Sequence, residues 1–264
     1  MKTKFLLLLN SITFILTLFI NYASSTGIIS GNGVGEVSAK YNSLITPASY
    51  AFSIWGFIYL MLFGFILFQW YSVFKLKDKK LIHDIGIWFI LSNFANSLWI
   101  VVWVNDIIFL SVVAMVILLF SLIKLVFRLR LEIWDAPLKI MFFVWWPITF
   151  YFGWIVLASV VNITSFVVSL KMNIGGGLEE LLALVVLIVA TIIYYLLVSK
   201  RNLREASLVG IWGLIAIAVK QFGINDIISY TSIVLALVLL LVSGRHAYRN
   251  RETTPVNKFK RKEF

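Results

Sequence analysis

Long apolar runs alternate with short polar segments along the whole chain. The runs cover residues 5–22, 48–74, 82–104, 107–127, 138–162, 181–198, 207–222 and 226–243. A helix needs about 20 mostly apolar residues to cross the hydrocarbon core of a bilayer, and each run is close to that length. The pattern therefore predicts an all-α membrane protein, a polytopic bundle of eight transmembrane helices.

The polar segments between the runs carry signals of helix boundaries. Residues 24–46, rich in Ser, Gly and Asn, form the long polar loop of the first half of the chain. Pro47 follows this loop, and we expect it in the first turn of the second helix, where a missing N–H does no harm. Glu179 and Glu180 follow the glycines at 175–177, and carboxylates at a helix N-terminus complement the helix dipole. We therefore expect the sixth helix to begin near these glycines.

Basic residues are distributed unequally between the two sides of the predicted bundle. If the amino terminus lies inside, then of the 23 Lys and Arg residues only Lys40, Lys171 and Lys220 lie outside. Such an excess of inside charge sets the orientation of membrane helices. The sequence thus predicts that both termini are cytoplasmic, and we expect a multi-pass protein of the cytoplasmic (inner) membrane.

The first apolar run has a second interpretation. It follows Lys2 and Lys4 and precedes small residues at 23–25, a pattern that also fits a cleavable signal peptide. We favour a retained helix, because the run is long for a signal peptide and its removal would leave an odd number of spans.

Composition supports the membrane assignment. Hydrophobic residues make up 61% of the chain, charged residues 13%, and the mean hydropathy is +0.96, whereas a soluble domain carries about 25% charged residues. These values exclude a soluble enzyme, a disordered chain and a collagen. They also weigh against an outer-membrane barrel, whose alternating strands give a weaker hydropathy signal.

The net charge is +11, and most of the basic residues that cause it are predicted to lie on the cytoplasmic side of the membrane. The tail, residues 247–264, follows the last span and is strongly basic, and such clusters attract anionic lipid. We therefore expect anionic lipid as a partner of the tail, and no nucleic acid.

The chain has no Cys and only His83 and His246 as imidazoles, so we expect no metal site. No predicted span has a carboxylate near its middle, which argues against a proton-driven pump.

Three predicted helices carry aromatic and amide residues at helical spacing. Nine of the ten Trp residues lie between Trp55 and Trp154. Residues three or four positions apart share a helix face, and the matching sets, helix by helix, are Trp55 and Tyr59; Asn96, Trp99 and Trp103; and Tyr151, Trp154, Ala158 and Asn162. These faces can serve helix packing, in which Asn bonds between helices. They can also converge on a pocket for a flat apolar ligand, which needs aromatic walls and a few polar groups.

At these residues the sequence resembles the translocator protein family, also called tryptophan-rich sensory proteins (TspO/MBR). The second helix of that family carries a Pro, a Trp eight residues later and a Tyr four after that, matched here by Pro47, Trp55 and Tyr59. The third carries Asn-x-x-Trp-x-x-x-aromatic, matched from Asn96, and the fifth carries Tyr-x-x-Trp-x-x-x-Ala-x-x-x-Asn, matched from Tyr151. The resemblance covers about residues 1–170.

The resemblance implies a fold and a function. Family members are five-helix proteins that bind porphyrins, sterols and drug-like ligands, commonly as homodimers, and their longest loop is a lid, here residues 24–46. Proposed family roles are transport, tetrapyrrole-linked stress signalling and light-dependent porphyrin breakdown. We expect a five-helix domain over 1–170, a three-helix extension over 171–246 that could occupy the place of a partner subunit, and a basic cytoplasmic tail over 247–264.

The leading hypothesis is a non-enzymatic membrane receptor or carrier for a planar hydrophobic ligand. A tetrapyrrole, haem-like or sterol-like molecule would stack on Trp99 and Trp154, while Asn96 and Asn162 form hydrogen bonds or tie helices together. We expect no catalytic residues and no other cofactor. The ligand-binding residues that we expect are Trp55, Tyr59, Asn96, Trp99, Trp103, Tyr151, Trp154, Ala158 and Asn162.

Two alternatives come from other classes. The chain could be a permease or the membrane subunit of a larger assembly, with the aromatic faces serving only helix packing. It could also be an enzyme acting on tetrapyrroles, for which the sequence offers aromatic residues alone.

Overall fold

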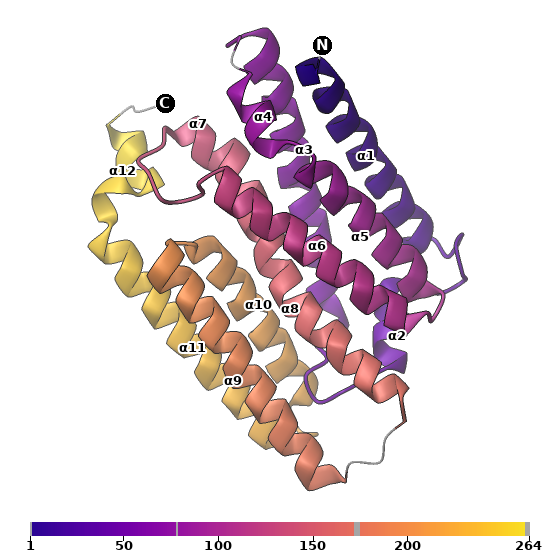
Figure 1. The fold of residues 1–264 in the computed structure, drawn as a ribbon. Helices are drawn as coiled ribbons and strands as arrows, with labels where there is room; N and C mark the ends of the chain where they lie inside the picture. The colour runs from indigo at the N-terminus through magenta and orange to yellow at the C-terminus, as the bar shows by residue number, and fades with distance from the viewer. Residues whose placement is uncertain (1, 78, 172–174, 262–264) are drawn as a thin grey trace.

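The structure, a computed structural model, describes residues 2–77, 79–171 and 175–261, and these ranges contain helices and no strands (Figure 1). Each of the eight apolar runs contains one long helix. These helices are α1 (Lys2–Ser25), α3 (Ile54–Phe74), α5 (Trp88–Val104), α6 (Ile108–Arg128), α8 (Trp146–Ser169), α9 (Gly176–Arg201), α10 (Arg204–Gln221) and α11 (Asp226–Arg249).

Short helical segments join or extend the long helices. They are α2 (Val34–Lys40), the 3₁₀ turns η1 (Ser49–Ser53) and η3 (Arg251–Thr253), α4 (Lys80–Ile85), α7 (Leu138–Ile140), the π-helical turn η2 (Met141–Trp145) and α12 (Pro255–Lys260). Pro47 lies before η1 and not in a first helical turn, so its expected position is wrong: the chain is still non-helical there. The π turn precedes Pro147, which has no N–H to give to the residue four positions earlier.

Six helical segments of the described chain are long and apolar enough to cross a membrane. They cover residues 2–25, 49–74, 108–128, 138–169, 176–201 and 226–249. Helix α5 is apolar but has 17 residues, and α10 has 18 residues that include Arg204, Glu205 and Lys220. The protein is therefore a multi-pass membrane protein.

Five helices of the first two thirds of the chain form a closed ring. Around this ring α1 contacts α5, α5 contacts α6, α6 contacts α8, α8 contacts α3, and α3 contacts α1. Polar bonds reinforce the position of α1: Asn10 Nδ2 donates to Gln69 Oε1 at 2.8 Å, and Thr17 Oγ1 donates to the Asn93 carbonyl at 3.0 Å. Helix α1 thus completes the ring.

The last three long helices form a second unit that packs on α8. Helices α9, α10 and α11 contact one another, and α10 lies against α8. At this contact a Cβ built on Gly153 would lie 2.8 Å from Ala206 Cα, so only glycine allows the two backbones to approach so closely. The Tyr194 hydroxyl of α9 also donates to the Gly153 carbonyl at 2.7 Å.

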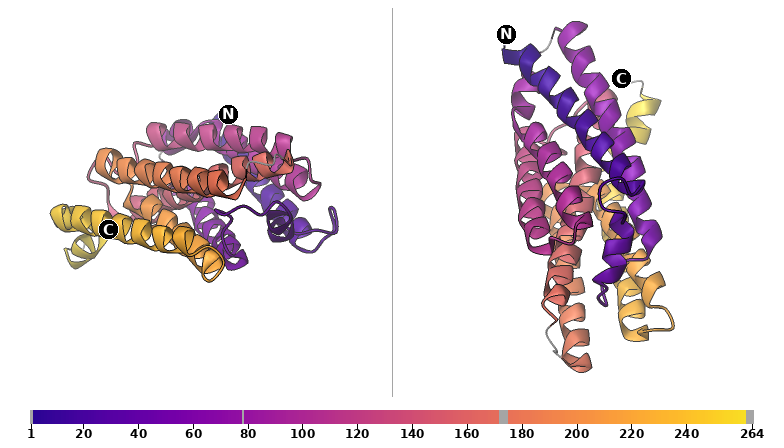
Figure 2. Two further views of the ribbon diagram at one scale, coloured as in Figure 1. Left: turned by 90° about the horizontal axis from the view of Figure 1, so that it is seen from below. Right: turned by 90° about the vertical axis from the view of Figure 1, so that its right-hand side faces the viewer.

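Both termini lie at one end of the bundle, and α2 and the beginning of α9 lie at the other (Figures 1 and 2). We call the end with the termini the inner end and the opposite one the outer end. At the inner end α12 returns to the loop between α6 and α7. Lys258, which is 2% exposed, forms an ion pair with Asp135 and donates to the Ala136 carbonyl at 2.8 Å. Part of the expected tail is thus docked on the protein, while its residues 262–264 lie outside the described residues.

Candidate ligand-binding site

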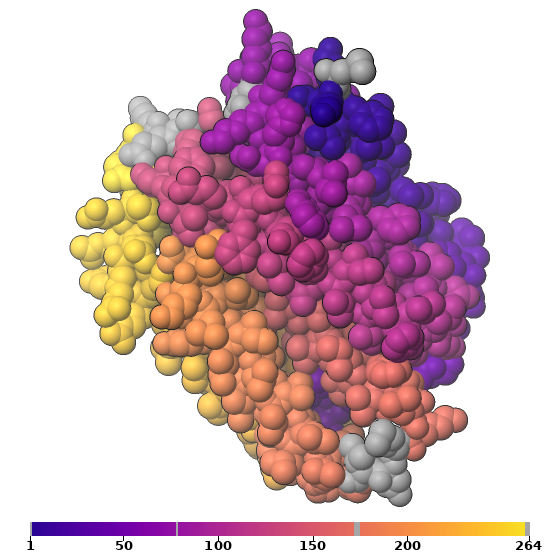
Figure 3. Space-filling view, viewed as in Figure 1, coloured from indigo at the N-terminus to yellow at the C-terminus, as the bar shows by residue number. Residues whose placement is uncertain are grey.

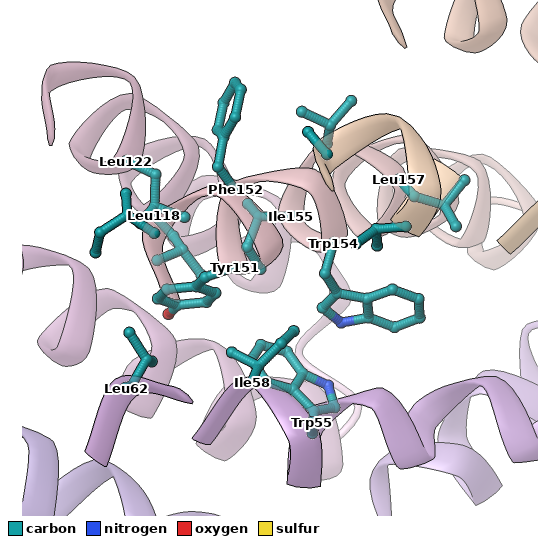
Figure 4. Close-up of a cluster of buried hydrophobic side chains, with 14 of the residues drawn as sticks. Trp55, Ile58, Leu62, Leu118, Leu122, Tyr151, Phe152, Trp154, Ile155 and Leu157 are labelled. Carbon is teal, nitrogen blue, oxygen red and sulfur yellow. The ribbon is translucent and has the colours of Figure 1, made fainter. Parts of the chain in front are cut away.

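The interior of the ring holds a cluster of aromatic side chains centred on Trp55. Its ring centroid lies 5.3 Å from that of Tyr59, 5.9 Å from Tyr151, 6.1 Å from Trp99 and 6.3 Å from Trp154. Figure 4 shows Trp55 of α3 facing Tyr151 and Trp154 of α8. Residues from α3, α5 and α8 therefore meet inside the ring, as their helical spacing predicts.

The amides of this cluster tie helices together. Asn96 Nδ2 donates to the Tyr151 hydroxyl at 2.8 Å, and Trp99 Nε1 donates to Asn162 Oδ1 at 3.1 Å. Asn162 Nδ2 in turn donates to Ser111 Oγ at 2.8 Å. These bonds connect α5 with α8 and α8 with α6. Ser111 was not among the expected residues, because a lone Ser in an apolar run carries no signal in the sequence.

Some buried polar atoms of the cluster have no hydrogen-bond partner. They are the Trp154 indole N–H and the Asn96 carbonyl oxygen. A buried polar group without a partner costs about 1–3 kcal/mol, so such atoms are uncommon in folded proteins. Both atoms can therefore still form a hydrogen bond.

The space between these side chains is almost filled. A cavity of about 20 Å³ remains, and five expected residues line it: Trp99, Trp103, Trp154, Ala158 and Asn162. The other four, Trp55, Tyr59, Asn96 and Tyr151, do not line this cavity. A volume of this size holds about one water molecule. The nine residues are therefore brought together, but in this conformation they do not enclose a hollow for a planar ligand.

A much larger cleft opens next to the cluster at the outer end. We call it the lid cleft; it has a volume of about 730 Å³ and is lined by Asn21, Ser24, Ser25, Thr26, Gly27, Gly31, Gly33, Val34, Gly35, Glu36, Ala39, Ser49, Phe52 and Trp55. Most of these residues belong to the long polar loop, so that loop does cover one side of the ring. Its aromatic lining residues are Phe52 and Trp55.

Phe52 separates the lid cleft from the small cavity, because its side chain lines both. It packs edge-on against Trp154, with the ring centroids 6.1 Å apart. Phe52 is not among the residues expected from the sequence, although it lies three positions before Trp55 and so has the same helical spacing as the expected residues. It lies on the 3₁₀ turn η1, where that spacing is not expected to hold.

The outer loop is fastened over the ring by polar contacts. Trp103 Nε1 donates to the Val34 carbonyl at 3.1 Å, and Lys40 Nζ pairs with Asp106 Oδ2 at 2.5 Å. Within the loop, Glu36 accepts a hydrogen bond from the Gly33 N–H at 2.7 Å and so caps α2. Trp103 therefore holds the loop and also lines the small cavity.

A separate polar cluster lies at the inner end, where the ring meets the last three helices. Glu132 is 8% exposed, and burial together with the charge of Glu205 raises its pKa to about 8, against the opposing effect of Arg204. Asn202 Nδ2 donates to the Glu132 carbonyl at 2.8 Å, and a ring nitrogen of His246 lies 2.9 Å from Asn202 Oδ1. In the described ranges no group of three His, Asp or Glu side chains could hold a metal ion.

Comparison with known proteins identifies a family and no individual relative. A family model described as TSPO-like protein matches residues 7–245. Neither a curated protein nor a solved structure matches the chain. The family match covers the ring with its aromatic cluster, and it continues through α9 and α10 and most of α11, beyond the segment over which the motifs of the sequence resemble the translocator proteins. The chain therefore belongs to the TSPO-like protein family.

Proposed function

We propose that this protein is a non-enzymatic membrane receptor or carrier for a planar hydrophobic ligand of the tetrapyrrole or sterol class. The observation that carries the proposal is the lid cleft of about 730 Å³, whose lining includes Phe52 and Trp55, two residues that also pack against Trp154 of the aromatic cluster. Pockets for small molecules commonly have volumes of about 300–1,000 Å³, with aromatic walls and a few polar groups.

Binding in this proposal proceeds from the cleft to the cluster. A flat ligand first stacks on Trp55, and rotation of the Phe52 side chain then joins the cleft with the cavity beside Trp99 and Trp154. The nine expected residues line the opened site. Burial of about 300 Å² of apolar ligand surface contributes about 7 kcal/mol before entropic costs, which is compatible with binding in the micromolar range.

Quenching of tryptophan fluorescence by protoporphyrin tests the proposal. We expect saturable quenching in the wild-type protein and at least tenfold weaker binding after Trp154→Ala or Ala158→Phe, because the first removes a stacking surface and the second fills the cavity. Phe52→Ala is expected to tighten binding, since it removes the side chain between cleft and cavity.

Trp134→Phe is the matched control. It also removes one indole, but from the exposed loop at the inner end, and we expect its Kd to equal that of the wild type. If Trp154→Ala and Ala158→Phe both leave the Kd unchanged, the ligand does not bind at the aromatic cluster.

A second candidate function is a permease or a membrane subunit of a larger assembly. Two observations support it: the cavity is nearly filled, and the hydrogen bonds of Asn96 and Asn162 connect neighbouring helices. This alternative predicts no saturable binding of protoporphyrin and a soluble partner that co-purifies through the basic inner surface.

We also propose eight spans with both termini in the cytoplasm. At a rise of about 1.5 Å per residue, the 17 residues of α5 and the 18 of α10 reach about 26 and 27 Å, close to the thickness of the hydrocarbon core of about 30 Å. Because the chain has no Cys, single-cysteine variants report the orientation directly. In intact cells an impermeant maleimide should label Asn32→Cys, and it should label Glu252→Cys only after the membrane is opened.

Two partners complete the proposal. The basic tail binds anionic lipid, and the ring forms homodimers unless α9–α11 occupy the dimerisation surface. Flotation with vesicles that contain or lack phosphatidylglycerol tests the binding of anionic lipid. The native mass of the purified protein tests whether it forms a homodimer.

A further inference from the structure

A groove lies between the outer parts of α8 and α9, away from the aromatic cluster. Its floor is the segment around Leu44 and Ile45, and its walls include Ile163 and Val167 of α8 and Ala183 and Val186 of α9. The groove has a volume of about 390 Å³. In the space-filling view of Figure 3, purple atoms of the first half of the chain are visible in the gap between α8 and α9.

The groove exists because α9 packs on α10 and α11 and only weakly on α8. Ala183 is 8% exposed, and its short side chain leaves space inside the groove. Ile163 and Val167 are 49% and 40% exposed and border the opening of the groove. From Glu179 to Val186, α9 extends about 10 Å along the groove at a rise of about 1.5 Å per residue. An aliphatic groove on membrane helices is in contact with lipid, since water is excluded from the bilayer core.

The polarity of the groove changes along its length. Most side chains that line the groove are aliphatic. Glu179, in the first turn of α9, and Asn42 are polar and lie at the outer rim of the groove. The neighbouring Glu180 accepts a hydrogen bond from Asn225 at 2.8 Å. Among the described residues Glu179 forms no ion pair. A carboxylate at the rim complements a positively charged group, which the amine of a lipid headgroup provides.

We propose that this groove binds one phospholipid with a primary-amine headgroup, such as phosphatidylethanolamine. One acyl chain lies between α8 and α9, and the ammonium group lies beside the Glu179 carboxylate. The lipid then fills the space that the two helices leave open and links the ring with the last three helices. The site is separate from the aromatic cluster, so it does not depend on the ligand proposed above.

Native mass spectrometry of the full chain, released from detergent and titrated with phosphatidylethanolamine or phosphatidylglycerol of the same acyl composition, tests the proposal. We expect one tightly bound phosphatidylethanolamine in the wild type. Ala183→Phe fills the groove from α9 and Ile163→Trp narrows it from α8, and each should weaken binding at least tenfold. Since Ile163 is exposed, Ile163→Trp leaves the protein core unchanged and keeps the test valid if Ala183→Phe disturbs folding.

Two further variants complete the experiment. Leu181→Phe adds the same ring at an exposed position of α9 outside the groove and should bind the lipid as the wild type does. Glu179→Gln should weaken the binding of phosphatidylethanolamine and leave the binding of phosphatidylglycerol, which the basic tail can also bind, unchanged. The proposal is overturned if Ile163→Trp retains phosphatidylethanolamine with wild-type affinity, or if Ile163→Trp weakens the binding of both lipids equally.

Discussion

The ring and the last three helices both contain helices long and apolar enough to cross a membrane, but the two regions associate through different contacts. In the ring, large aromatic side chains meet at 5–6 Å around Trp55, and side-chain hydrogen bonds connect α1, α3, α5, α6 and α8. In α9–α11 and on the face of α8 that they cover, glycines bring the helices together: a Cβ on Gly210 would lie 2.7 Å from the Tyr194 ring, and one on Gly213 would lie 1.9 Å from Leu157.

The difference shows which region can change shape. Small residues let helix backbones approach closely, and α10 packs against α8 in this way. The aromatic cluster instead depends on rings that can rotate and on polar atoms that still lack partners. A ligand site is therefore expected in the ring, and the predictions below test whether the two kinds of packing differ in this way.

The largest effect is expected where the two regions meet. Gly153→Ala places a methyl group 2.8 Å from the Ala206 backbone. Overpacking of this kind costs about 1–3 kcal/mol. We expect the free energy of unfolding to fall by about 3 kcal/mol, because the backbone of Ala206 cannot move aside as a flexible side chain can. Equilibrium unfolding of both proteins in mixed detergent micelles measures this loss of stability.

Gly64→Ala is the control within the ring. There the added Cβ would lie 3.5 Å from Phe143, an ordinary contact, so stability should be unchanged or slightly higher. Equal destabilisation by the two alanines would contradict a glycine-dependent contact between α8 and α10.

The hydrogen bonds of the ring provide the second test. Asn162→Ala removes the acceptor of the Trp99 indole and the donor to Ser111, and leaving buried groups unpaired costs about 1–3 kcal/mol. We expect a loss of about 2 kcal/mol in the free energy of unfolding. Asn105→Ala, at an exposed position where the amide bonds only to its own helix, should cost less than about 0.5 kcal/mol.

The pH dependence of stability reports the inner-end contact between the two regions. The pKa of Glu132 is raised from 4.5 to about 8, so between these pH values the folded protein holds a proton that the unfolded chain has lost. Stability should therefore fall as the pH rises through this window, by about 1 kcal/mol per unit, below the limit of about 1.4 for one proton. Glu132→Gln, which cannot ionise, should flatten the slope, and an unchanged slope would contradict the assignment.

The smallest effect is expected within the last three helices. Ser243→Ala removes the hydrogen bond to Ser207 at 3.1 Å, and hydrogen bonds between membrane helices contribute about 0.6 kcal/mol on average. A loss as large as that of Asn162→Ala would show that the two regions rely equally on polar contacts.

Apolar run lengths were sufficient to predict the long helices, because a helix that crosses a bilayer needs about 20 mostly apolar residues. Spacing of three and four residues was also sufficient to bring Trp55, Trp99 and Trp154 together, since residues on one helix face must point the same way. Run length could not predict the interruption at Gly86, whose φ is +56°, or the π turn before Pro147, because both depend on local backbone hydrogen bonds.

The candidate site was harder to predict than the helices. Whether converging rings enclose a hollow or fill it depends on rotamers and on sub-ångström packing, which spacing does not encode. Phe52 was missed because it lies on a 3₁₀ turn, and Ser111 because it contacts Asn162 from another helix. The docking of Lys258 was missed because a basic tail carries no signal of the residues it contacts, which lie 122 positions earlier.

The contact of Lys258 with Asp135 and Ala136 also has a consequence for biosynthesis. Helices inserted from the amino terminus assemble while translation continues, so the ring can form before α9–α11 have left the ribosome. Lys258 follows all eight long helices in the sequence, so the inner loop can be bound by Lys258 only after those helices have been synthesised. A premature stop codon after α11 would leave every span in place and this contact unformed.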